Sequence, residues 1–198
     1  MYGSNMHKGD YLTTILRSNK TVFSSKDIGL LWGDQGTDAA RVRLNYYVKR
    51  GDLHHIRKGF YAKSKDYNKL ELATRIFTPS YVSFETVLAQ EGVIFQYYEA
   101  ITIASYLTRE IEIEEQVYSC KKIKDAVLTD IAGIKHVNET SMATKERAFL
   151  DTLYINTDYK FDNTRSLDWD SVFRILPVYG NKRIVRKVEW LHGHSKGK

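Results

Sequence analysis

A group of cationic and amide side chains lies within residues 38–50, DAARVRLNYYVKR, where apolar residues recur at helical spacing. The apolar residues fall on one face of such a helix, and they are Ala40, Leu44, Tyr47 and Val48. Arg41, Arg43 and Asn45 fall on the remaining surface. Arg and Asn can make paired hydrogen bonds to the edges of guanine and adenine in a DNA major groove. The pattern therefore predicts that these three side chains read bases.

A basic turn follows this helix. Gly51 ends the helix, and the extended runs DLHHI and FYAK then flank Arg57-Lys58-Gly59, where glycine can adopt a positive φ. Cations outside the base-reading positions mainly hold phosphates. The residues predicted to do so are Lys26, Lys49, Arg50, Arg57 and Lys58. Thr37, which with Asp38 is a candidate N-cap of the helix, and Tyr46, which fits either the core edge or a phosphate contact, complete the predicted DNA-binding set.

Two shorter helical segments precede the cationic one. Residues 10–19 carry apolar side chains at helical spacing, and Ser24 or Ser25 can cap a second helix that Gly33 ends. Three short helices followed by a basic hairpin predict a winged helix-turn-helix over residues 1–63. In that arrangement the third helix enters the major groove and the wing reaches phosphates or the minor groove.

The distribution of charge agrees with this prediction. Residues 1–63 contain eleven Lys and Arg against five acidic residues, so they carry the whole formal charge of +6. Residues 64–180 sum to −5 and residues 181–198 to +5. Neutralised phosphates release counterions and so favour binding of a basic segment to nucleic acid. The alternative is a basic surface that is merely solvated.

The rest of the chain is predicted to form a connecting segment and a second domain. Residues 64–78 form a linker and a connecting helix that Thr78-Pro79-Ser80 ends, and residues 79–198 form a mixed α/β domain with a polar, mobile tail from residue 192. Strands are expected at 100–107 and 110–120, and helices at 84–94, 145–155, 169–176 and 182–191. The fold class predicted for the whole chain is α+β.

Composition excludes several classes of protein. With 198 residues, 42% hydrophobic and 27% charged, the chain is long enough to bury a core and is not of a disordered type. No apolar run is long enough for a membrane helix, the N-terminal residues lack the apolar stretch of a signal peptide, and Cys120 is the only cysteine. The expected location is the cytoplasm, without a membrane partner.

An enzymatic alternative rests on acidic residues. Glu112 and Glu114 fall on one face of the strand expected at 110–120, next to Glu115, and Asp168 and Asp170 form a second pair. Clustered carboxylates can bind the divalent ions of a nuclease or nucleotidyltransferase. The same alternation is typical of a solvent-facing strand, and no phosphate-binding or dinucleotide glycine motif is present. The prediction is therefore a protein without catalytic residues, metal or cofactor.

Three segments, in order, resemble AbiEi-type antitoxins, the winged-helix regulators of bacterial type IV toxin-antitoxin and phage-defence operons. They are VKRGDLHHIRKGFYAKS, LATRIFTPSYVSFETVLAQEGVI and MATKERAFLDTLY. Lys145 stands where the family often has proline, and both residue types fit the first turn of a helix. The resemblance covers about residues 10–190.

The resemblance implies a function for each domain. The N-terminal domain would bind operator DNA and repress its own operon, and the C-terminal domain would counter a nucleotidyltransferase toxin without requiring a stable complex with it. Glu146, Arg147 and Asp151 are expected to form surface pairs or part of an antitoxin surface, the structural role being favoured, and Ser83 and Glu85 to serve a helix entry. A winged-helix regulator without a toxin partner is the main alternative, followed by the metal-dependent nucleic-acid enzyme.

Overall fold

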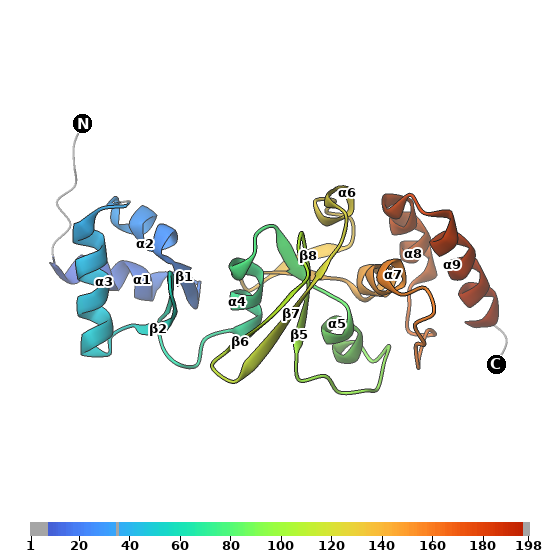
Figure 1. Ribbon diagram of the computed structural model, residues 1–198, viewed down its shortest axis with the longest axis horizontal. Coiled ribbons are helices and arrows are strands. Elements are labelled where there is room, and N and C mark those ends of the chain that lie inside the picture. The colour runs from blue at the N-terminus through green and yellow to red at the C-terminus, as the bar shows by residue number, and fades with distance from the viewer. Residues whose placement is uncertain (1–7, 35, 196–198) are drawn as a thin grey trace. The chain divides into compact units, whose positions relative to one another are not determined.

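The computed structural model describes residues 8–34 and 36–195, and in that part of the chain it is a mixed α+β protein (Figure 1). The chain divides into two compact units, residues 1–72 and 73–198. The division falls within helix α4 (Lys69–Ile76). Each unit has its own sheet, so each is described by itself.

The first unit combines helices with a small antiparallel sheet. Its elements, in chain order, are α1 (Lys8–Arg17), β1 (Val22–Ser24), α2 (Ser25–Trp32), α3 (Asp38–Arg50), β2 (His54–Arg57) and β3 (Phe60–Ala62). The three strands pair in the order β1-β3-β2. Strand β1 was not expected from the sequence. Its three residues are too few to show an alternation, but Val22 and Phe23 are completely buried.

Local chemistry fixes the helix ends in this unit. Ser24 caps α2 in a reciprocal pair with Asp27, in which each side chain accepts from the backbone N–H of the other residue. Thr37 caps α3 by accepting a hydrogen bond from the Ala40 N–H. Gly33 and Gly51 end α2 and α3 in the left-handed conformation. These ends agree with the predicted ones.

The core of the first unit forms where the three helices meet. It consists of Ile15, Phe23, Ile28, Trp32, Ala40, Leu44, Tyr47 and Leu53. Trp32 donates its indole N–H to the Tyr11 carbonyl at 2.9 Å, and its ring lies edge-on to the Tyr11 ring. The face of α3 that carries Leu44 and Tyr47 is therefore buried, as the helical spacing predicted.

The second unit is built around a mixed sheet with the strand order β6-β7-β5-β4-β9-β8. Its strands are β4 (Ser80–Val82), β5 (Ile101–Ser105), β6 (Arg109–Ile113), β7 (Gln116–Lys122), β8 (Ile134–Val137) and β9 (Thr140–Ala143). Its helices after α4 are α5 (Glu85–Gln90), α6 (Asp125–Leu128), α7 (Lys145–Ile155), α8 (Trp169–Ile175), the 3₁₀ segment η1 (Leu176–Tyr179) and α9 (Lys182–Ser195). β5 runs parallel to β7, β4 runs parallel to β9, and the other pairs are antiparallel.

Two expectations for this unit were wrong, and one helix was missed. The strand expected at 110–120 is two strands, because Glu114 and Glu115 adopt positive φ angles of 49° and 66° and turn the chain back. Helix α6 was not expected. Helix α9 continues to Ser195, so residues 192–195 are helical rather than part of a tail, and residues 196–198 lie outside the described residues.

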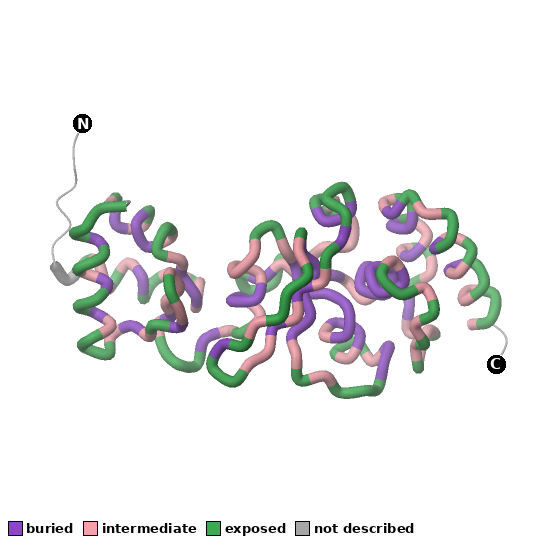
Figure 2. The backbone as a smooth tube through the Cα atoms, viewed as in Figure 1, coloured by how far each residue is buried: buried purple, intermediate pink, exposed green. Residues whose placement is uncertain are grey.

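Helix α7 occupies the centre of the second unit. Residues 146–153 are buried on every side of the helix, and α5, α8 and α9 pack against it. Figure 2 shows this helix and β5 in the colour of buried residues. Residues 146–153 have no solvent face, so the polar residues among them must find partners inside the unit.

Candidate nucleic-acid interface

Helix α3 presents a row of hydrogen-bonding side chains on its surface. Arg41, Asn45 and Lys49 succeed one another at intervals of four residues, and all three are exposed. The Arg41 guanidinium contacts the Asp38 carboxylate at 2.8 Å, with 74% and 88% of the two side chains exposed. An ion pair this exposed contributes little, so Arg41 can leave Asp38 for another acceptor at low cost.

The basic turn lies against the start of α2. Gly59 adopts a φ of 84°, and its carbonyl accepts a hydrogen bond of 2.9 Å from the Ser25 backbone N–H. This contact brings exposed Lys26 next to the turn that carries exposed Lys58 and half-buried Arg57. The structure thus groups three of the predicted phosphate-binding residues, although they come from segments about thirty positions apart.

Arg43, also predicted to read bases, is largely enclosed within the first unit. Only 23% of its side chain is exposed, its guanidinium contacts the Asp34 carboxylate at 3.1 Å, and the guanidinium carbon lies 3.7 Å from the centre of the Tyr11 ring. A guanidinium held by a carboxylate and an aromatic face must give up both contacts before it can read a base. Arg43 therefore acts to hold α1 and the loop before α3 against α3.

Asp34 links this contact to the start of α3. The Thr37 hydroxyl donates a hydrogen bond to Asp34, and Arg43 donates another; together they lower the pKa of the Asp34 carboxyl below its ordinary value. The same Thr37 hydroxyl accepts from the Ala40 N–H. Thr37 is exposed, but both hydrogen bonds of its hydroxyl are made inside the unit. We therefore assign it the role of capping α3 rather than a direct contact with DNA.

Tyr46 and Arg50 lie one turn apart on the other flank of α3. Arg50 Nη1 donates to the Tyr46 hydroxyl at 2.9 Å, and its guanidinium carbon lies 5.2 Å from the centre of the Tyr46 ring. Arg50 also contacts Asp52 at 2.9 Å. Tyr46 is 52% exposed, so it belongs to the surface and not to the core edge.

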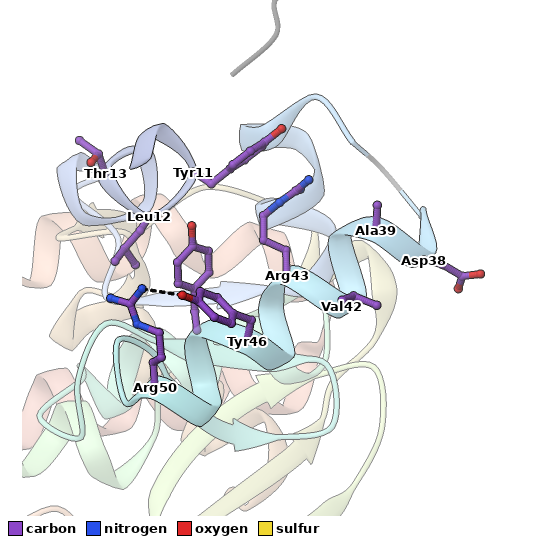
Figure 3. Close-up of a pocket in the computed structure, with 10 residues that line it drawn as sticks. Tyr11, Leu12, Thr13, Asp38, Ala39, Val42, Arg43, Tyr46 and Arg50 are labelled. Atoms are coloured by element: carbon purple, nitrogen blue, oxygen red, sulfur yellow. Dashed lines mark hydrogen bonds between the residues drawn. The ribbon is translucent and has the colours of Figure 1, made fainter. Parts of the chain in front are cut away.

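A groove of about 800 Å³ runs between α1 and α3 (Figure 3). Its lining residues are Tyr11, Leu12, Thr13, Asp38, Ala39, Val42, Arg43, Tyr46, Tyr47 and Arg50. Val42 is 65% exposed at its edge and is not among the residues predicted to bind DNA. An apolar residue in a helical pattern predicts burial, so periodicity gives no signal for an exposed valine.

The C-terminal motifs that carry the family resemblance meet in the interior of the second unit. Arg147 and Asp151 were expected on the surface, but neither side chain is exposed at all. The Arg147 guanidinium donates to the carbonyls of Val127 at 2.6 Å and Ala132 at 2.7 Å, and to the Tyr81 hydroxyl at 2.8 Å. The expectation was wrong because α7 is enclosed on all sides, which a stripe of apolar residues does not indicate.

Asp151 accepts hydrogen bonds from three hydroxyl groups, which lie on β4, on the residue that follows β4 and on η1. Ser83 and Tyr179 donate to its carboxylate at 2.7 Å, and Tyr81 donates at 3.0 Å. Ser83 was expected to serve the entry of α5, and it instead joins this buried network. Glu85, in the first turn of α5, pairs with Lys121 of β7 at 2.7 Å. These motif residues therefore organise the core of the unit.

The residues considered for metal binding lie apart or have other roles. Glu114 is in the turn after β6, so it does not share a strand face with Glu112. The Asp168 carboxylate caps α8, and the Ser171 hydroxyl lowers its pKa. Burial raises the pKa of the Cys120 thiol to about 11. Among the described residues, no three His, Cys, Asp or Glu side chains come together as a set of metal ligands.

The comparisons with known proteins concern the fold. No family model matches the sequence, and no curated protein matches it. The crystal structure of the RV2827C protein from Mycobacterium tuberculosis is similar over 93% of this chain and 75% of that one, with a TM-score of 0.51 and 11% sequence identity. At this identity the likeness extends to the α+β fold alone. Within residues 8–34 and 36–195, no helix combines the length and apolar character that crossing a bilayer requires.

Proposed function

We propose that the first unit is a winged helix-turn-helix that binds duplex DNA, with α3 as the reading helix and the turn at residues 57–59 as the wing. The observation that carries this proposal is the exposed row Arg41, Asn45 and Lys49 on α3. A helix that presents Arg41 and Asn45, which can make paired hydrogen bonds, together with the Lys49 ammonium along one solvent face suits the major groove and its flanking phosphates. The order of α1, α2, α3 and the basic hairpin supports the same assignment.

Charge supplies the sequence-independent part of the binding. Lys26, Arg57 and Lys58 gather beside the start of α2, and the first 63 residues carry a net charge of +6. Such cations bind phosphates and so release counterions from the DNA. The phosphate contacts position the reading helix but do not select a sequence. We do not assign direct DNA contacts to Arg43 and Thr37, because their polar groups bind Asp34 and hold the loop before α3.

The proposed biological role is that of an AbiEi-type antitoxin which represses its own operon and counters a nucleotidyltransferase toxin. The support is the resemblance of three ordered segments, from the hairpin to the MATKERAFLDTLY helix. Since Arg147 and Asp151 are buried, a surface that counters the toxin must use other residues of the second unit. A regulator that lacks a toxin partner uses the same DNA contacts and remains the second candidate.

The test of DNA binding is a fluorescence anisotropy titration of the full chain. It compares the duplex upstream of its own gene with a scrambled duplex at two salt concentrations. Tighter binding of the upstream duplex at both concentrations is expected, and equal binding of both duplexes, or binding only at low salt, contradicts the proposal. Co-expression with a neighbouring nucleotidyltransferase gene then separates the two candidates, because only an antitoxin restores growth.

A further inference from the structure

Two rows of side chains run next to each other along the outer surface of α3. The first is the donor row Arg41, Asn45 and Lys49 described above. The second is apolar and consists of Ala39, Val42 and Tyr46, which line the edge of the groove. All three residues of this apolar row are exposed, Val42 by 65% and Tyr46 by 52%. Helical spacing places Val42 within one turn of both Asn45 and Tyr46.

Neither helix formation nor the core accounts for valine at position 42. A β-branched residue forms helices less readily than alanine, and the core of the unit lies on the opposite side of α3, at Leu44 and Tyr47. Figure 3 shows Val42 projecting from α3 at the edge of the groove, away from the Arg43 side chain that lies against Tyr11.

Two contacts orient the Tyr46 side chain at one end of the apolar row. Its hydroxyl accepts from Arg50 at 2.9 Å, and its ring lies edge-on to the Tyr47 ring at 5.4 Å. The ring is thus held on two sides and borders Val42 toward the C-terminal end of α3. A donor row beside an apolar row gives α3 two chemically different strips, which a surface that is merely solvated does not require.

The major groove of an A·T pair has the same uneven chemistry. Adenine offers N7 and the N6 amino group, which an asparagine can contact together, and thymine offers O4 beside its C5 methyl group. Apolar side chains recognise that methyl group. We infer that Val42 contacts a thymine methyl group next to an adenine bound by Asn45, so that the pair Val42 and Asn45 selects an A·T step. This inference rests on the proposed function and specifies what the site selects.

The test replaces each thymine of the upstream duplex in turn by deoxyuridine, which removes only the C5 methyl group. Wild-type protein should lose affinity about fourfold at one thymine of each bound site, the factor expected from one methyl group that is no longer buried. Val42→Ala should bind the unmodified duplex about fourfold more weakly and be insensitive to that substitution. Val42→Thr, which keeps the β-branch and one methyl group, should keep part of the sensitivity.

A matched control is Leu16→Ala, which truncates another exposed apolar residue of the same unit, on α1. It should leave both the affinity and the deoxyuridine effect unchanged. Thermal melts of each variant by circular dichroism confirm that the unit is folded, as expected for changes at exposed positions.

The outcomes separate this inference from the proposed function. If wild-type protein binds the upstream and scrambled duplexes equally, the proposed function fails and this inference fails with it. If binding is specific but no single thymine matters, or if Val42→Ala retains the full deoxyuridine effect, the proposed function stands and the inference is wrong. If Val42→Ala changes only self-association in sedimentation, the apolar row is an interface between copies and the inference is also wrong.

Discussion

Arg147 and Asp151, one turn apart on α7, form an ion pair at 3.2 Å that is completely enclosed by the second unit. Each partner also has hydrogen bonds that the other does not supply. Arg147 binds the carbonyls around α6 and β8, and Asp151 accepts from hydroxyl groups on β4 and η1. The pair thus connects α7 to the segments on both sides of it. A buried charge is tolerated only when it is paired and hydrogen-bonded, and both conditions are met here.

Removing one partner of this pair should strongly destabilise the second unit. Arg147→Met leaves the Asp151 carboxylate buried without its cation and removes the guanidinium that donates to three backbone carbonyls. We expect a loss of about 3–5 kcal/mol in the free energy of unfolding. The measurement is urea unfolding followed by the fluorescence of Trp169 and Trp190, which both lie in this unit.

Two further variants make that measurement specific. Arg183→Met removes a pair with Asp158 whose side chains are 72% and 86% exposed, and its unfolding midpoint should match that of the wild type. The free energy of unfolding of the double variant Arg147→Met/Asp151→Leu should be about 1–3 kcal/mol higher than the sum of the two single losses predicts. Additive losses would mean that the two residues act independently.

Gly133 should not tolerate a side chain. It precedes β8 with a φ of 74°, and a Cβ there would lie 2.8 Å from both Arg147 Cβ and Ile175 Cδ1. Gly133→Ala should therefore destabilise by more than the roughly 1–2 kcal/mol that a left-handed backbone alone costs. Gly180→Ala is the matched control, since its φ is 53° and no atom lies within 4 Å of its Cβ position. Equal losses in urea unfolding would rule out the steric explanation.

The sequence predicts the first unit well because its signals are local. Ser24, Thr37, Gly33 and Gly51 mark helix ends through interactions within a few residues, and the structure has them there. The basic turn is likewise set by Gly59. Such signals require no knowledge of the tertiary fold.

The sequence predicts less where tertiary contacts decide. Arg43 falls on the outer part of a helical wheel, yet Asp34 and the Tyr11 ring, from other segments, enclose it. The sequence pattern predicts an exposed Arg147, because nothing local in the sequence indicates that α7 is covered on all sides. Glu114 continues an alternating pattern and still forms a turn. For Arg43 and Arg147 the deciding contacts come from outside the stretch of sequence in which periodicity is read, whereas the turn at Glu114 is a local feature that the alternation does not reveal.

Acid should weaken the start of α2. Burial disfavours the Asp27 carboxylate, but hydrogen bonds from the Ser24 hydroxyl and N–H, together with Lys20, outweigh this effect and lower the pKa of Asp27 below 3.8. Because the folded-state pKa is depressed, the stability that Asp27 contributes is present above pH 3.8 and is lost as the pH falls through the lower folded value.

The measurement for this effect follows Trp32 in a protein that carries Trp169→Phe and Trp190→Phe, so that fluorescence reports the first unit alone. The urea midpoint should fall between pH 5 and about pH 3, and it should fall less in Asp27→Asn. Asp38→Asn, which changes an exposed carboxylate of α3, should keep the wild-type pH dependence. An identical fall in all three proteins would show that Asp27 is not the group responsible.

Arg41 and Arg43 should differ in what they affect, although both were expected to read bases. Arg41→Ala should leave the unfolding of the first unit unchanged but cost about 1–3 kcal/mol in specific DNA binding and relax the base preference at one position. Arg43→Ala should lower both stability and binding, because Asp34 and Tyr11 lose their shared partner. Arg43→Lys should not restore stability, since an ammonium group cannot reproduce the flat contact with the Tyr11 ring. Equal effects on stability would contradict the positioning role.

Lys58 should act on all DNA sequences alike. It is exposed in the turn beside Lys26 and is assigned to phosphates, which carry no sequence information. Lys58→Ala should therefore weaken binding to the upstream and scrambled duplexes by the same factor and reduce the slope of log K against log salt by about one. Lys160→Ala removes an exposed lysine of the second unit and so changes the net charge by the same amount as Lys58→Ala. It should keep the salt dependence of the wild type. If the two variants reduce the slope equally, net charge rather than the turn determines binding. If Lys58→Ala weakens binding to the upstream duplex only, the turn reads sequence and its assignment to phosphates is wrong.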